Sequence, residues 1–241
     1  MPNLPAAPKK KKSDAFLDKV RAAKAVTRKA EPSRALIDAA LAPRRPRLVF
    51  AFDATASRRP AWEAAQAATD GLFTALPGSI DIALAVHGGG IVHTFTPFDD
   101  DVTAFRKKAA AIECAAGETR LVGIMEKVLD QSGVKVLMYT GDCFEESAEA
   151  AFDQADRFKL RGIRAIMLHD ERTGDGRAWE VFSEIARRTG GVCIKLHGGD
   201  RQAMRDIFEA VAVLAAGGVK LLKAEQRRLP GAAKLLPFIT D

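Results

Sequence analysis

Residues 47–57 read Arg47-Leu-Val-Phe-Ala-Phe-Asp53-Ala-Thr55-Ala-Ser57. The first six residues are a short apolar run with β-branched and aromatic side chains, which predicts a buried strand. Three oxygen-bearing side chains, Asp53, Thr55 and Ser57, follow at alternate positions, and a helix with proline in its first turn is expected over residues 60–76. A buried strand that leads through a polar loop into a helix is the first half of a βαβ unit.

The rest of the chain repeats this alternation. Strands separated by helices of about ten residues or more predict a parallel sheet that is covered on both faces. The run Gly88-Gly-Gly90 predicts a tight turn, so residues 91–95 are expected to form an antiparallel edge strand. The predicted fold is therefore α/β, a doubly wound and mostly parallel six-stranded sheet with one antiparallel edge strand. Further strands are expected at residues 80–86, 134–139, 163–168 and 192–196, and helices at 101–112, 121–129, 145–160, 177–188 and 201–216.

Charge divides the 241-residue chain into parts. Residues 1–46 hold twelve Lys or Arg and four Asp or Glu, a net charge of +8, whereas the remainder has a net charge of −2. We therefore predict a basic N-terminal arm with short helices (1–46), an α/β domain (47–218), and a C-terminal helix and tail (219–241). The run Lys9–Lys12 is a candidate contact for nucleic acid or an anionic surface. No aromatic residues interleave with these lysines, so a solvated tail is the preferred interpretation.

The sequence also bears on where the protein acts. It contains no run of about 20 apolar residues, the length that a membrane span requires. No apolar segment near the N-terminus resembles a secretory signal. The three cysteines are far apart in sequence, which favours reduced thiols over a disulfide framework. We therefore expect a cytoplasmic protein.

Three separate pieces of sequence supply oxygen ligands near predicted strand ends or helix starts. Asp53, Thr55 and Ser57 follow the first strand, Thr119 precedes a helix, and Asp142 follows the strand over residues 134–139. Ligands of open α/β sheets bind outside the carboxyl ends of the strands. Two carboxylates and several hydroxyls suit a hard cation that keeps part of its water shell. The alternative is that Asp53, Ser57 and Thr119 only cap helices.

These residues resemble the von Willebrand factor A domain and its metal-ion-dependent adhesion site, whose pattern is Asp-x-Ser-x-Ser, a later Thr and an Asp after the fourth strand. Thr55 replaces the first Ser. The family has Asp followed by Gly at the last position, whereas this chain has Gly141-Asp142, so Glu145 and Glu146 are alternative ligands. The stretches 52–57, 141–146 and 211–218 are also similar to bacterial cytoplasmic proteins that carry this domain.

The resemblance implies a metal-dependent protein–protein interaction module, an adaptor or assembly factor, and not an enzyme. It implies Mg²⁺ or Mn²⁺, with Ca²⁺ as an alternative, and a partner protein that offers an acidic residue to the open coordination position. The alternatives are a structural subunit of a larger assembly with incidental metal, nucleic-acid binding through the arm, and a metal-dependent hydrolase. The expected partner-binding rim consists of Arg58, Arg59, Glu118, Glu145 and His169.

Two histidines flank the Gly-rich turn. His87 and His93 are interpreted as hairpin residues near the sheet edge, with a metal role as the minor alternative. The nucleophile elbow Gly-x-Ser-x-Gly is absent from the sequence, which removes the usual α/β-hydrolase mechanism.

Overall fold

The computed structural model describes residues 45–55, 63, 65–66, 68–69, 71–72, 80–114, 117–171, 175–196 and 201–239. The chain divides into two units, residues 1–43 and 44–241, and every described residue belongs to the second. The predicted basic arm, except for its last two residues, and most of the predicted helix over residues 60–76 lie outside the described residues.

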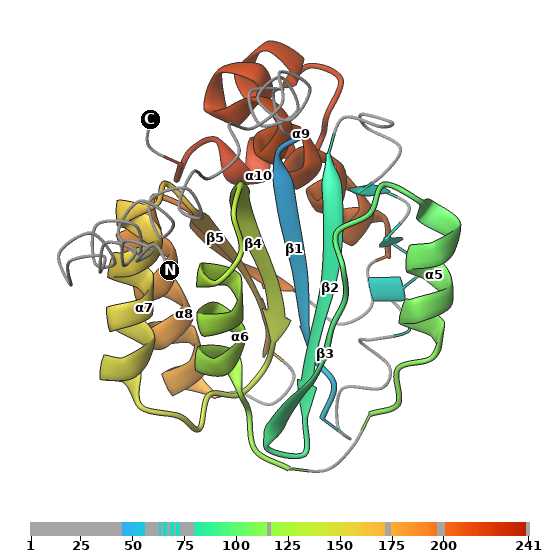
Figure 1. Ribbon diagram of the computed structural model, residues 1–241. Coiled ribbons are helices and arrows are strands. Elements are labelled where there is room, and N and C mark those ends of the chain that lie inside the picture. The colour runs from blue at the N-terminus through green and yellow to red at the C-terminus, as the bar shows by residue number, and fades with distance from the viewer. Residues whose placement is uncertain are drawn as a thin grey trace, which may run out of the picture. The chain divides into compact units, whose positions relative to one another are not determined.

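A six-stranded sheet with the order β3-β2-β1-β4-β5-β6 organises the described part of the chain (Figure 1). All neighbouring strands pair in parallel except β2 and β3, which are antiparallel. This arrangement confirms the predicted fold class. The strands are β1 Arg47–Asp53, β2 Asp81–Gly88, β3 Ile91–Phe95, β4 Val134–Gly141, β5 Arg164–Asp170 and β6 Val192–Leu196.

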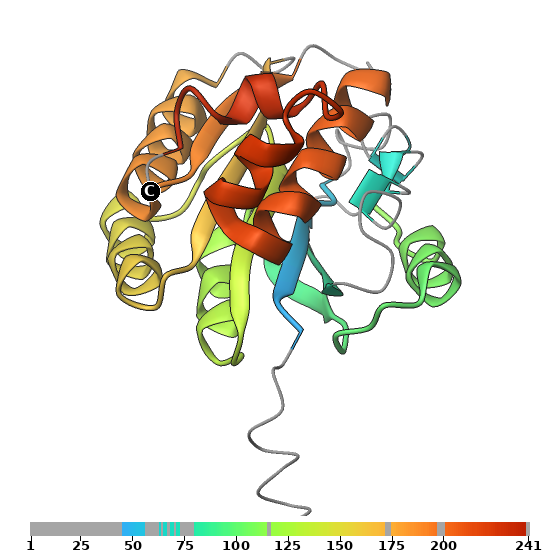
Figure 2. The same ribbon diagram turned by 90° about the horizontal axis from the view of Figure 1, so that it is seen from above.

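Helices cover both faces of the sheet (Figure 2). Alternate residues of β1 point to opposite faces, as strand geometry requires. Leu48 and Phe50 belong to the core beneath α9, whereas Val49 and Ala51 belong to the core beneath α6, α7 and α8. The helices are α5 Val102–Ala110, α6 Leu121–Leu129, α7 Ala148–Leu160, α8 Gly176–Thr189, α9 Arg201–Glu225 and α10 Ala232–Leu235.

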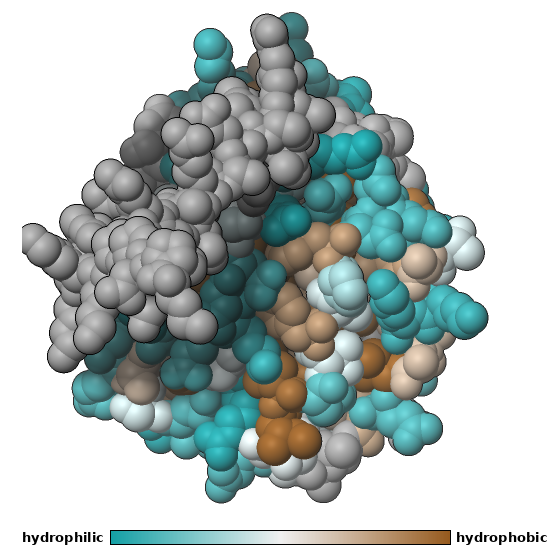
Figure 3. Space-filling view, viewed as in Figure 1, coloured by the Kyte–Doolittle hydropathy of each residue, from teal (hydrophilic) through white to brown (hydrophobic). Residues whose placement is uncertain are grey.

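The antiparallel hairpin closes one side of the sheet. Its turn uses Gly89 and Gly90, whose φ angles of 60° and 78° lie in the left-handed region that glycine adopts without steric cost. Figure 3 shows apolar side chains gathered along β3, where Ile91 is exposed. Strand β2 continues two residues beyond its predicted end, because His87 and Gly88 still pair with β3 before the turn begins.

The segment after residue 216 packs into the core. Helix α9 is broken at Gly218, whose φ of 67° and ψ of −166° are not helical, and the chain then turns back on the domain. Leu222, Leu229 and Leu235 are almost fully buried in the same core as Leu48 of β1. The residues predicted to form a C-terminal helix and tail therefore contribute to the domain core. No helix among the described residues is long and apolar enough to cross a membrane.

Candidate metal site

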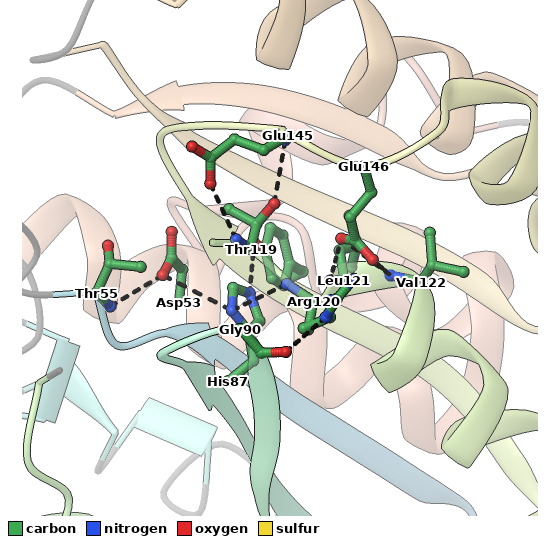
Figure 4. A network of polar contacts seen from close by, with 11 residues as sticks. Asp53, Thr55, His87, Gly90, Thr119, Arg120, Leu121, Val122, Glu145 and Glu146 are labelled. Carbon is green, nitrogen blue, oxygen red and sulfur yellow. Dashed lines mark hydrogen bonds and ion pairs between the residues drawn. The ribbon is translucent and has the colours of Figure 1, made fainter. Parts of the chain in front are cut away.

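Asp53 is the last residue of β1 and is fully buried. Its Oδ1 accepts a hydrogen bond from the Thr55 backbone N–H at 3.0 Å, so the side chain turns the backbone out of the strand. Thr55 is partly buried in the loop that follows, at the carboxyl edge of the sheet (Figure 4). Ser57, the third residue of the predicted motif, lies outside the described residues.

Asp142 is the second buried carboxylate at this edge, with 2% of the residue exposed. It directly follows β4, the neighbour of β1, and the pairing of Phe52 with Thr140 places it one position beyond the level of Asp53. Gly141 explains this shift, because a Cβ at position 141 would lie 2.6 Å from the Tyr139 hydroxyl. A carboxylate at position 141 would clash with that ring, so the acidic residue stands at 142.

Thr119 supplies the third piece of the predicted site and is almost fully buried. Its backbone N–H donates to Glu145 Oε2 at 3.0 Å, and its Oγ1 accepts from the Glu145 backbone N–H at 3.1 Å (Figure 4). This reciprocal pair joins the loop before α6 to the loop after β4. The helix predicted from residue 145 instead begins at Ala148, because the Ser147 hydroxyl caps it, so Glu145 remains in the loop.

Glu146 strengthens the same junction. Its carboxylate accepts from the backbone N–H groups of Leu121 at 2.6 Å and Val122 at 3.2 Å and so caps α6, which has no cap of its own. Burial raises the pKa of the Glu146 carboxyl to about 7, although both N–H groups act in the opposite direction. Glu146 therefore serves as a helix cap in this structure.

His87 lies beside Asp53, although the sequence favoured a hairpin residue over a metal role. It is fully buried and lies opposite Asp53 in the pairing of β1 and β2, with 3.8 Å between His87 Nδ1 and Asp53 Oδ1. Its Nε2 is 2.9 Å from the Tyr139 hydroxyl, and its Nδ1 accepts from the Arg120 backbone N–H at 3.3 Å. The predicted strand over residues 80–86 stops one residue before His87, whereas β2 continues to Gly88 and includes it. A longer strand prediction would therefore have placed His87 in the sheet.

The structure describes three of the five residues of the predicted rim, Glu118, Glu145 and His169. The Glu118 side chain is 71% exposed and lies 4.0 Å from the Arg120 guanidinium. His169 is a correction: it was expected on the surface but is buried, because Trp179 and Phe182 of α8 pack against its ring. Burial lowers the pKa of the His169 imidazole. Arg58 and Arg59 lie outside the described residues.

The donor set at this edge fits a hard cation. Within the described ranges, no three His, Cys, Asp or Glu side chains form a cluster that could hold a metal ion. The predicted set has a different composition, because it combines the carboxylates of Asp53 and Asp142 with the hydroxyls of Thr55, Ser57 and Thr119. Two buried carboxylates at the ends of adjacent strands would repel each other, and a dication between them would remove that repulsion.

In comparisons of sequence, neither a protein-family model nor a curated protein matches this chain. Its fold is similar to solved structures. These include a von Willebrand factor type A protein from Catenulispora acidiphila (TM-score 0.59, 16% identity, 72% of this chain and 43% of that one). A second is the pilus adhesin SpaC from Lactobacillus rhamnosus GG (TM-score 0.58, 11% identity, 76% of this chain and 30% of that one). A third is the VWA domain of SpRpn10, which is covered over nearly its whole length (TM-score 0.54, 11% identity, 68% of this chain and 95% of that one).

This chain therefore spans less than half of the first two proteins but nearly all of the isolated Rpn10 domain. At identities of 11–16%, the likeness establishes the fold and not the activity. The mostly parallel six-stranded sheet and its antiparallel edge strand are those predicted from the sequence. The described part of this chain has the fold of a von Willebrand factor A domain.

Proposed function

We propose that this domain is a protein-interaction module that recognises an acidic side chain of a partner protein through a bound divalent cation. The observation that carries the proposal is the burial of two carboxylates, Asp53 and Asp142, at the carboxyl ends of the adjacent strands β1 and β4. Two carboxylates in neighbouring buried positions repel each other. A dication at this edge would remove that repulsion.

The cation would be held by Asp53, Ser57, Thr119 and Asp142, directly or through water, with Thr55 contributing to the shell. Oxygen ligands of this kind favour Mg²⁺ or Mn²⁺, with Ca²⁺ as the alternative. The cation would leave one coordination position open after these residues bind it. A carboxylate of the partner protein can fill that position, attracted by the positive charge of the cation. This arrangement would be the metal-ion-dependent adhesion site that the sequence resemblance implies.

A binding role is favoured over catalysis by the state of His87. The Nδ1 of this histidine lies 3.8 Å from Asp53 Oδ1, and both of its ring nitrogens are engaged, one by the Tyr139 hydroxyl and one by the Arg120 backbone N–H. A ring in these contacts is not poised to take a proton from a substrate. The likeness to a pilus adhesin, a protein whose task is binding, agrees with this choice.

We place the module in the cytoplasm. The three cysteines, Cys114, Cys143 and Cys193, form no disulfide with one another. Disulfides are common in secreted proteins and rare in reducing compartments, so this cysteine pattern favours a reducing compartment.

Thermal unfolding in EDTA, Mg²⁺, Mn²⁺ and Ca²⁺ tests the cation. A ligand that binds only the folded state raises the unfolding midpoint. We expect Mg²⁺ or Mn²⁺ to raise the midpoint of the wild type and of Asp130→Ala, a control that removes an exposed carboxylate at the C-cap of α6. Asp53→Ala is expected to remove the shift. A wild-type midpoint that no cation moves would contradict the proposal.

Selection from a displayed peptide library tests the partner chemistry. We expect peptides that contain Asp or Glu to be enriched in Mg²⁺, and the enrichment to disappear in EDTA or with Asp53→Ala. Equal enrichment with and without the cation would show that the partner does not bind through the metal.

A further inference from the structure

His87 lies at the point where three segments of the proposed cation site meet. It pairs with Asp53 across β1 and β2, and it is fully buried. Its side chain points to the face of the sheet that Tyr139 also occupies, beneath α6 and α8. Through its two nitrogens it touches the loop before α6 and strand β4 (Figure 4).

The hydrogen bonds assign the form of the ring. A backbone N–H can only donate, so His87 Nδ1 must accept from Arg120 and therefore carries no proton. In the neutral imidazole the proton is then on Nε2, which donates to the Tyr139 hydroxyl at 2.9 Å. A doubly protonated ring would present an N–H to the Arg120 N–H and lose that contact.

We infer that His87 is a positioning residue that holds Thr119 at a fixed distance from Asp53, an inference that rests on the proposed function. Arg120 directly follows Thr119, so the hydrogen bond from the Arg120 backbone N–H to His87 Nδ1 anchors the loop on one side. The Glu145 pair anchors Thr119 from the other side. Partners that orient the ligands of a metal site set its affinity without touching the metal.

The turn of the hairpin reinforces the same anchor. The Gly90 backbone N–H donates to the Glu118 carbonyl at 3.1 Å, and the Arg120 side chain donates to the Gly90 carbonyl. Gly117 must remain glycine, because its φ is 143° and a Cβ there would lie 2.3 Å from Gly89 Cα. The loop that carries Thr119 is thus held by two contacts with Gly90 of the hairpin turn and by the His87 ring of β2.

The experiment compares variants of the full chain by titration with Mn²⁺. His87→Leu fills a similar space with an apolar side chain and so removes both hydrogen bonds of the ring. We expect the Kd of this variant for Mn²⁺ to rise about 10–100-fold. His87→Gln is expected to retain most of the affinity, because its carboxamide offers an acceptor to Arg120 and a donor to Tyr139. His93→Leu is the matched control, because His93 is an exposed histidine on β3 and should bind as the wild type does.

Amide hydrogen exchange of Arg120, measured in EDTA, separates this inference from the proposed function. We expect His87→Leu to exchange faster at Arg120 and His87→Gln to stay protected. If the wild type binds no Mn²⁺, the proposed function fails and the Arg120 exchange alone decides whether His87 holds the loop. Unchanged Arg120 exchange in His87→Leu, or wild-type Mn²⁺ affinity in that variant, would overturn the inference.

Tyr139→Phe provides the second variant if His87→Leu does not fold. It keeps the imidazole but removes the acceptor for its Nε2 proton. We expect Mn²⁺ affinity to fall in this variant also, with faster exchange at Arg120. Full affinity together with unchanged exchange would overturn the inference by an independent route.

Discussion

Thr119 and Glu145 hold each other through two reciprocal hydrogen bonds, although 26 residues separate them in sequence. Each residue donates its backbone N–H to an oxygen of the other side chain. The Thr119 hydroxyl oxygen has two lone pairs and accepts one bond from Glu145, so one lone pair remains for a cation. The pair thus fixes the hydroxyl in place without exhausting it.

Thr119→Val and Thr119→Ser separate the hydroxyl from the shape of the side chain. Valine matches threonine in volume but leaves the Glu145 N–H without its acceptor. We expect Thr119→Val to lose about 1–3 kcal/mol of unfolding free energy and the stabilisation by Mg²⁺. Thr119→Ser should keep both, as urea unfolding with and without Mg²⁺ would show. Mg²⁺ stabilisation of the valine variant equal to wild type would remove Thr119 from the site.

Glu146 predicts a pH dependence of stability. Burial raises the folded-state pKa of this carboxyl to about 7 from an ordinary value of 4.5. The folded state then binds the proton more tightly, so this contribution is fully present below pH 4.5 and is lost as pH rises through 7. Urea unfolding of wild type and Glu146→Gln should show the wild type losing stability relative to the variant between those values. A difference that stays constant with pH would contradict this assignment.

Asp175 and Asp101 form a matched pair of helix caps. Asp101 accepts only from the first N–H groups of α5, whereas Asp175 caps α8 and also accepts from the Phe144 backbone N–H at 3.2 Å. We expect Asp101→Ala to cost about 1 kcal/mol of unfolding free energy. Asp175→Ala should cost about 1 kcal/mol more, because Phe144 loses its acceptor. Equal losses in chemical denaturation would show that the Phe144 contact is not stabilising.

Cys193 should react slowly with alkylating reagents in the folded protein. Burial raises the pKa of the Cys193 thiol to about 12, so its reactive thiolate is scarce at neutral pH. We expect iodoacetamide at pH 8 to modify Cys193 much more slowly in the folded protein than after unfolding in urea. Peptide mass spectrometry resolves the site. Rapid labelling of native Cys193 would show that the thiol is not held in this buried environment.

The sequence was sufficient to predict the sheet, since alternating apolar strands and amphipathic helices leave few arrangements for a chain of this length. The same apolar runs predict where Asp53 and Asp142 lie, because each stands at the end of a strand that is easy to recognise. The positions that the sequence does not predict depend on contacts between distant segments. The sequence favours His87 as a hairpin residue near the sheet edge, whereas the pairing of β2 with β1 places it beside Asp53, where it is buried.

Glu145 and Glu146 also depend on contacts between distant segments, and here the predicted helix is longer than the observed one. Glutamate favours helices, and two of them before an alanine-rich stretch predict a helix start at residue 145. The structure uses both carboxylates across the loops, for Thr119 and for the first turn of α6, and starts α7 at Ala148. His169 is expected at the rim because it follows the strand predicted over residues 163–168, but it lies inside β5 and the aromatic residues of α8 cover it.

The burial of the C-terminal segment has a consequence for how the domain is made. Phe50 of β1 packs against Phe208 of α9 with 5.2 Å between ring centroids, and Leu229 and Leu235 join the same core. The strand at the centre of the sheet is synthesised about 160 residues before the side chains that cover it. During synthesis, part of one apolar face of β1 therefore stays exposed until α9 and α10 emerge, and we expect chaperones to bind the nascent chain during that interval.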